Sequence, residues 1–225
     1  MKNARVIKSG TNSNKTGKKP MHRFVTAAVL MSLMSSPAFA GPSIEARLAG
    51  GSLELDDDID NIESETSGID LRAMAPINNL LFLRGQFSHT EGDEIEVNGT
   101  DFDADLEITN VRGGLGIQAA TESFRYYGVL EGARIKLNLE GDPESGNGVI
   151  LSGGLGDIGK SAFIWNVELG LASIDHADGG TFDFTLGYRF NPTWAIVGGG
   201  QSYVLDNDGV ELSFGQGTLG VRVSF

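Results

Sequence analysis

Apolar and polar residues alternate along most of the chain beyond residue 40. In 182–190 every second residue is apolar and the residues between are polar or glycine, and 163–171 has a similar alternation. Successive side chains of a β-strand point to opposite faces, so this period of two predicts strands with one apolar and one polar face. We expect ten strands, at residues 42–54, 68–75, 80–97, 100–119, 124–139, 148–157, 161–174, 181–190, 193–205 and 210–225.

The connections between these strands also alternate. Those after the even-numbered strands are short, such as "PINN" at 76–79, whereas those after the odd-numbered strands are longer and acidic, such as "EGDPESGNG" at 140–148. Short periplasmic turns and longer extracellular loops are typical of outer-membrane barrels. The sequence therefore predicts an all-β, transmembrane antiparallel up-and-down barrel, with both termini in the periplasm and long loops outside the cell.

Aromatic residues gather near the predicted periplasmic ends of the strands, where an interfacial girdle is expected. A secreted soluble β-sandwich would also alternate with period two, but it does not explain this placement or the unequal connections. The aromatic positions are Phe124, Tyr126, Tyr127, Phe163, Trp165, Tyr188, Phe190, Trp194 and Phe225.

The first 40 residues predict an export signal. Residues 1–23 carry seven Lys or Arg and no acid, the apolar run 24–34 follows, and Ala38 and Ala40 form an A-x-A cleavage pattern. We expect residues 1–40 to be a signal peptide with an extended basic leader, translated from Met1 or from Met21, and residues 41–225 to be the barrel. The apolar run is too short for a stable membrane-spanning helix.

The net charge and the cysteine content limit the kinds of partner and metal site that the chain can have. Removing the signal peptide takes 7 of 17 basic residues and none of the 30 acidic ones, so residues 41–225 have a net charge of 10 − 30 = −20. Nucleic acid is then an unfavourable partner, because phosphate binding needs clustered Lys and Arg. The chain has no cysteine, which excludes a disulfide or a thiolate metal site.

The last eight residues, "TLGVRVSF", resemble the C-terminal β-signal of bacterial outer-membrane proteins. The pattern consists of polar Thr218, then Gly220, Val223 and the aromatic Phe225. The whole segment 41–225 is similar in pattern to the small outer-membrane β-barrels, the opacity-protein and OmpX-like porins. The resemblance implies insertion by the barrel-assembly machinery. Members of this family of similar size usually have eight strands, so eight is the alternative to the ten strands expected here.

One motif suggests nucleotide binding. Residues 154–161, "GLGDIGKS", match the phosphate-binding pattern G-x-x-x-x-G-K-[ST]. That pattern binds phosphate when a helix starts at its Lys-Ser, but Lys160 and Ser161 open an alternating, strand-like segment. We expect a periplasmic hairpin turn and no nucleotide.

Candidate catalytic residues are sparse. Residues 41–225 contain two histidines, His89 and His176. The flanking Ser88 and Thr90 should face away from His89, whereas Asp175 could orient His176 as an omptin-like outer-membrane protease would require. Because loop polarity explains His176 more simply, we expect no enzyme, with such a protease as a minor alternative.

Acidic segments raise the question of metal binding. Asp56, Asp58 and Asp60 have the first spacings of a calcium loop, but its glycine and its closing glutamate are missing. We expect no cofactor and no high-affinity metal site, and we leave open a weak divalent-cation bridge to lipopolysaccharide. Outer-membrane lipid and lipopolysaccharide are the expected surroundings.

The polar faces of the strands predict a charged lumen. Opposite charges inside a narrow barrel are tolerated only when they are paired. The lumen is then either closed by a plug of ion pairs or, if water enters it, a narrow charged channel. The expected lumenal residues are Glu45, Arg47, Asp70, Arg72, Arg84, Arg112, Glu168, Asp183, Arg189 and Arg222.

The third and fourth strands predict a protruding hairpin. Asn98-Gly99 favours a two-residue type I′ turn, and about 18 residues per strand reach roughly 60 Å, beyond the 9–11 residues that cross a bilayer. The hairpin could keep neighbours at a distance, or bind an extracellular ligand through an exposed edge or Phe102. We expect a structural or surface-interaction (adhesion or receptor-like) role, with a narrow porin as the alternative.

The terminal strand yields a first prediction. Replacing Phe225 by Asp should block barrel assembly while export continues, because this strand carries the insertion signal and closes the barrel. Heat-modifiable gel mobility of the exported protein measures the outcome. A normally folded Phe225→Asp barrel would contradict the assignment.

Overall fold

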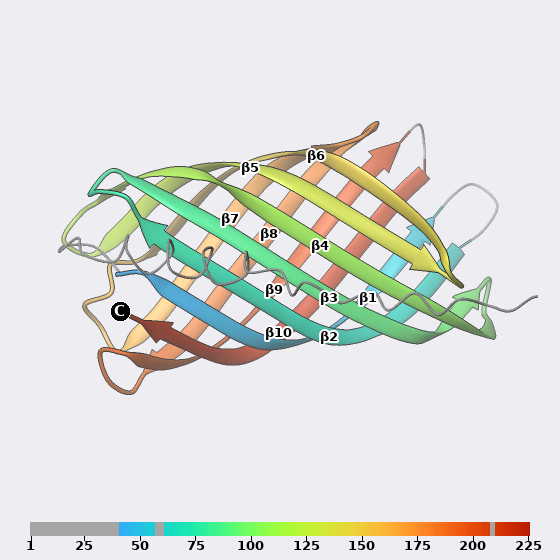
Figure 1. Cartoon of the computed structure of the whole chain (residues 1–225), viewed down its shortest axis with the longest axis horizontal. Helices are drawn as coiled ribbons and strands as arrows, with labels where there is room; N and C mark the ends of the chain where they lie inside the picture. The colour runs from blue at the N-terminus through green and yellow to red at the C-terminus, as the bar shows by residue number, and fades with distance from the viewer. Residues whose placement is uncertain (1–40, 57–60, 208–209) are drawn as a thin grey trace, which may run out of the picture. The chain divides into compact units, whose positions relative to one another are not determined.

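The computed structural model describes residues 41–56, 61–207 and 210–225. It is a closed barrel in which each strand pairs antiparallel with its sequence neighbours and β1 pairs with β10 (Figure 1). The predicted fold class is confirmed, and the barrel has ten strands, not the alternative of eight. The predicted signal peptide lies outside the described residues. The strands are β1 (Ser43–Asp56), β2 (Asn61–Pro76), β3 (Leu81–Val97), β4 (Thr100–Ala120), β5 (Phe124–Leu139), β6 (Asp142–Asp157), β7 (Phe163–Ile174), β8 (Ala177–Arg189), β9 (Trp194–Asn207) and β10 (Val210–Ser224).

The barrel has two different ends. At the terminal end the amide of Phe225 donates to the carbonyl of Pro42 (3.0 Å), beside the four connections that follow the even-numbered strands. At the opposite end, here called the hairpin end, Asn98-Gly99 and Glu140-Gly141 form two-residue turns. Among the described residues, no helix is long and apolar enough to cross a membrane.

The prediction of long loops at the hairpin end is wrong. β2 starts at Asn61, not 68, and β6 starts at Asp142, not 148, so the acidic residues 61–67 and 142–147 belong to strands. The connections at this end that lie within the described residues, 98–99, 140–141 and 175–176, have two residues each. Acidic residues and glycine have low strand propensity, which made these segments look like loops. Their backbone groups nevertheless pair with the neighbouring strands, as Asp142 does opposite Leu139.

The polarity of the two barrel faces reverses along the strands, as β1 illustrates. Near the terminal end Leu48 points outward and is 72% exposed, while Arg47 points inward and is 3% exposed. Near the hairpin end Leu53 points inward and is 6% exposed, while Glu54 faces outward. The terminal half therefore has the apolar exterior of a membrane barrel, and the hairpin half has the apolar interior of a soluble one.

The apolar outer band covers the length needed to cross a bilayer. On β7 the outward residues from Phe163 to Leu171 are apolar, which spans nine residues against the roughly 9–11 that a tilted strand needs. Most of the predicted girdle aromatics are exposed around the terminal end, as Tyr188 and Trp194 are. Tyr127 is an exception, because it is buried inside the barrel.

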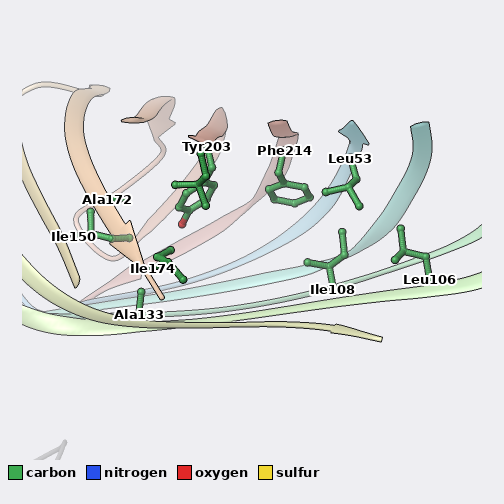
Figure 2. Packing of buried hydrophobic residues seen from close by; sticks show 10 residues of the cluster. Leu53, Leu106, Ile108, Ala133, Ile150, Ala172, Ile174, Tyr203 and Phe214 are labelled. Atoms are coloured by element: carbon green, nitrogen blue, oxygen red, sulfur yellow. The ribbon is translucent and has the colours of Figure 1, made fainter. Parts of the chain in front are cut away.

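A cluster of apolar side chains fills the barrel at the hairpin end (Figure 2). A small cavity of about 20 Å³, roughly the room for one water molecule, lies in the part of the cluster around Leu53, Tyr203 and Phe214. The cluster thus closes this half of the lumen. Its buried members are Leu53, Leu106, Ile108, Ala133, Ile150, Ala172, Ile174, Tyr203, Leu205 and Phe214.

The two halves should respond differently to a charge on the outer face. Leu169 lies in the apolar band and is 64% exposed, so Leu169→Arg should lower the free energy of unfolding by about 2–4 kcal/mol near the bilayer midplane. Urea unfolding in lipid vesicles measures this. Ser173→Arg is the matched control, because Ser173 lies on the same face of β7 nearer the hairpin end. An equal loss in both variants would contradict the position of the band.

Candidate functional site

The middle of the lumen holds a charge-balanced network of five arginines and five carboxylates. Eight strands, all except β6 and β9, contribute these side chains from their inner faces, where they alternate with the outward apolar residues. The ten expected lumenal residues all lie on this face or at its mouth, where Arg189 is found. The network members are Arg47, Arg72, Arg84, Arg112 and Arg222 with Glu45, Asp70, Glu131, Glu168 and Asp183.

Glu45 is shared by two arginines. Nε of Arg222 donates to Oε1 of Glu45 (2.7 Å), and Nε of Arg47 donates to Oε2 (2.8 Å). Arg47 also donates to the hydroxyls of Thr185 (3.0 Å) and Thr218 (3.1 Å). This group links β1 to β8 and β10, and it carries one positive charge in excess.

Arg72 is shared by two carboxylates. Its Nε donates to Oδ2 of Asp70 (2.7 Å), and its Nη1 donates to Oδ2 of Asp183 (2.7 Å). Asp70 belongs to the same strand as Arg72, whereas Asp183 lies on β8 across the lumen. The pair of bonds therefore joins non-adjacent walls of the barrel.

Arg84 is the most densely bonded arginine. It donates to Oε1 and Oε2 of Glu131 (3.0 and 2.5 Å) and to Oε1 and Oε2 of Glu168 (2.8 and 2.5 Å). The hydroxyl of Tyr127 donates to Oε2 of Glu168 (2.7 Å), and Nη1 of Arg112 lies 4.0 Å from Glu131. This group ties β3, β5 and β7 together.

Amide side chains connect these groups. Gln86 accepts from Arg112, and its Nε2 donates to Asp70 (2.8 Å) and to Oε1 of Gln201 (2.9 Å). Tyr203 marks the boundary with the apolar cluster, because its hydroxyl accepts from Asn110 (2.8 Å) while its ring packs within that cluster. The lumen thus changes from ionic to polar to apolar toward the hairpin end.

Sequence reasoning missed Glu131, Gln86 and Tyr127. Glu131 lies on the inward face of β5 between Val129 and Ala133. Because both of these neighbours are apolar, the alternation on β5 does not indicate a polar inward face. The signal that could have found it is charge: the expected lumenal residues include six arginines and only four acids, so a further buried carboxylate was needed.

The phosphate-loop motif at 154–161 consists of the end of β6 and most of the connection to β7. Glycine at 154 is required because a Cβ there would lie 2.5 Å from the ring of Tyr127. Gly159 has a φ of +78°, and its amide donates to Oδ2 of Asp157 (2.7 Å). Strand β7 follows in place of a helix, and this amide is already engaged, so the segment lacks the geometry of a phosphate loop.

The two histidines lie apart from the lumenal network. His89 faces outward, with its ring nitrogens 3.0 Å from Oγ1 of Thr109 and 3.1 Å from Oε1 of Glu91. His176 and Asp175 form the two-residue connection between β7 and β8. In the described ranges no group of three His, Asp or Glu side chains is placed to hold a metal ion; Asp58 and Asp60 are outside these ranges.

The remaining sequence-predicted residues lie at the two ends. Thr218 and Gly220 face inward on β10, and a Cβ on Gly220 would lie 2.0 Å from the carbonyl oxygen of Ala46, so glycine allows the close approach to β1. Val223 points outward, and Phe225 is exposed at the terminal end. At the hairpin end Asn98 and Gly99 have φ of 51° and 79°, the positive pair that a type I′ turn requires.

These features define the class of protein. In lipid every backbone polar group needs an internal partner, which a closed antiparallel barrel supplies, and the apolar band and ionic interior are those of bacterial outer-membrane proteins. The chain is an outer-membrane β-barrel.

Comparison with known proteins finds similarity only to solved structures. No protein-family model and no curated protein sequence matches the chain. Similar solved structures include Ail, the attachment invasion locus protein of Yersinia pestis (17% identity, 81% of this chain and 98% of that chain, TM-score 0.36). Others are Neisserial surface protein A (15%, 82% and 97%, 0.42) and the outer membrane protein OprG from Pseudomonas aeruginosa (12%, 84% and 97%, 0.44).

The network predicts a large cost for removing its most bonded cation. Arg84→Met should lower the free energy of unfolding by about 3–5 kcal/mol, because Glu131 and Glu168 would stay buried without that partner. Urea unfolding of the refolded protein measures the change. Arg134→Met, on the exposed outer face of β5, is the control and should change it little. Equal effects would show that the network does not stabilise the barrel.

Proposed function

We propose that this chain is a non-conducting outer-membrane barrel that presents a stiff, acidic surface at the hairpin end to partners outside the cell. The observation that carries the proposal is the continuation of the strands beyond the apolar band. β4 has 21 residues, about twice the number that crosses a bilayer. Its excess length is ordered sheet, which presents side chains in fixed positions.

The charge of the extension supports a surface role. Outward positions beyond the band include Glu65, Glu91, Glu96 and Asp105, which are exposed. Charged residues on the exterior keep such an extension soluble, and one sign of charge favours partners of the opposite sign. The extracellular partner proposed is therefore a basic protein surface of a host, phage or neighbouring cell.

β4 supplies an edge for such a partner. Its pairing with β5 starts at Leu106 opposite Leu139, so in the described part of the chain residues 100–103 of β4 pair with β3 alone. Phe102 lies in this segment and is 52% exposed. An unpaired strand edge with an exposed aromatic side chain is suited to pairing with an extended segment of another protein.

The closed lumen favours this role over the porin alternative. The ion-pair network occupies the middle of the lumen and the apolar cluster fills the hairpin half. An ion moving through would have to leave water and displace both layers. We also propose that the terminal end faces the periplasm, that the barrel-assembly machinery inserts the chain among outer-membrane lipid and lipopolysaccharide, and that the role is not catalytic.

Trimming the hairpin tests the proposal. Replacing residues 93–103 by a short turn should leave heat-modifiable folding intact and abolish adhesion of bacteria displaying the protein to host cells or to one another. The reason is that the change removes the free edge and Phe102 but not the closed barrel. Planar-bilayer recordings of both proteins should show no open channel.

A control separates the edge from charge alone. Changing Glu140, Asp142 and Glu144 to Gln removes three charges at the β5–β6 hairpin and keeps the β4 edge, so adhesion should persist. Adhesion that survives trimming would contradict the proposal. If trimming opened a conducting pore, the hairpin would be a gate and the porin role would replace the surface role.

A further inference from the structure

A cavity of about 490 Å³ occupies the lumen at the terminal end. It extends from the ion-pair network to the connections 158–162 and 190–193 and to Gly41 and Phe225, which also line it. The network and the apolar cluster close its other side. The volume lies in the range of small-molecule sites, and the cavity opens at one end of the barrel only.

The lining is basic although residues 41–225 as a whole are strongly acidic. Eight lining side chains are Arg or Lys and four are Asp or Glu. The five network arginines are balanced by five carboxylates, two of which, Asp70 and Glu131, lie behind the cavity surface. Three further cations, Arg125, Lys160 and Arg189, face one further carboxylate, Asp157.

These mouth residues leave positive charge without a partner. Asp157 accepts from the backbone amide of Gly159 (2.7 Å), and Nη2 of Arg189 lies 3.9 Å from it. Nη1 of Arg189 donates to the carbonyls of Gly159 (2.8 Å) and Ser161 (2.6 Å), which orient the guanidinium but do not neutralise it.

Arg125 has no ion-pair partner in the described part of the chain. Its guanidinium carbon lies 5.0 Å from the centre of the Tyr127 ring, and Nη1 makes only long contacts to Gln118 (3.4 Å) and the sulfur of Met74 (3.5 Å). In the described ranges it has no carboxylate within 4.0 Å, and its Nε has no hydrogen-bond partner. Arg125 is half-buried with its Nε atom shielded from solvent, and a guanidinium withdrawn from water without an anion carries a cost that an incoming anion would relieve.

We propose that this cavity is a binding site for a small organic anion carrying carboxylate or phosphate groups, with Arg125 as its principal contact and Lys160 at its mouth. The anion enters from the terminal end and binds without crossing the barrel. The site goes beyond the surface role proposed above and shares no residue with the hairpin that carries that role.

Isothermal titration of the refolded 41–225 barrel in a non-ionic detergent, with citrate and pyrophosphate as probes, tests the site. We expect saturable binding that weakens as sodium chloride is raised. Arg125→Gln should weaken it about tenfold or more, because a charge-assisted hydrogen bond is lost. Since Arg125 has no ion pair among the described residues, this variant should keep its heat-modifiable fold.

Arg134→Gln is the matched control, because it removes the same charge from the outer face of the same strand. It should bind both probes like the unchanged protein. Lys160→Gln, in an exposed turn, should weaken binding a few-fold and provides the test if Arg125→Gln fails to fold. Binding of one probe only would identify the preferred anionic group. Absence of saturable binding, or equal weakening by Arg134→Gln, would overturn the proposal.

Discussion

Neutralisation of charge inside a narrow lumen is the constraint on which this barrel depends. Five arginines and five carboxylates are removed from bulk water, and each is tolerable only beside an opposite charge. The bonds also act as cross-links: Arg72 on β2 reaches Asp183 on β8, and Arg84 on β3 reaches Glu168 on β7. A shift of one residue in any of these strands would turn the charge toward lipid, so the network fixes register as well as closure.

The same ten strands have a lipid-facing part and a water-facing part. At membrane depth the exterior is apolar and the interior ionic, whereas beyond it the exterior is acidic and the interior is a packed apolar cluster. The change requires no break in the sheet. Inward positions change from charged to apolar along a strand, while outward positions change from apolar to polar. Tyr203 lies at the junction, with its hydroxyl in the polar layer and its ring in the cluster. The apolar cluster inside the hairpin half and the continuation of the sheet beyond the apolar band both follow from this exchange.

The two ends of the barrel differ in charge, which the net charge of −20 conceals. Acidic side chains cover the outside at the hairpin end, while cations gather around the cavity at the terminal end. An acidic exterior and a basic cavity favour partners of opposite charge at the two ends of one molecule. Surface binding at one end and anion binding at the other are therefore physically compatible.

Sequence by itself predicted ten strands, with eight as the alternative, and the inward face of residues such as Asp70 and Arg84, because alternation is a local property of the chain. It also placed the Asn98-Gly99 turn, whose positive φ angles depend on those two residues. Tertiary structure alone decided that the acidic segments are strands, because pairing with a neighbour outweighs low propensity. It also decided that Tyr127 lies inside, where Gly154 on the next strand leaves room, and that Arg125 lacks a carboxylate among the described residues. These outcomes depend on distances between residues far apart in the chain, which no local pattern contains.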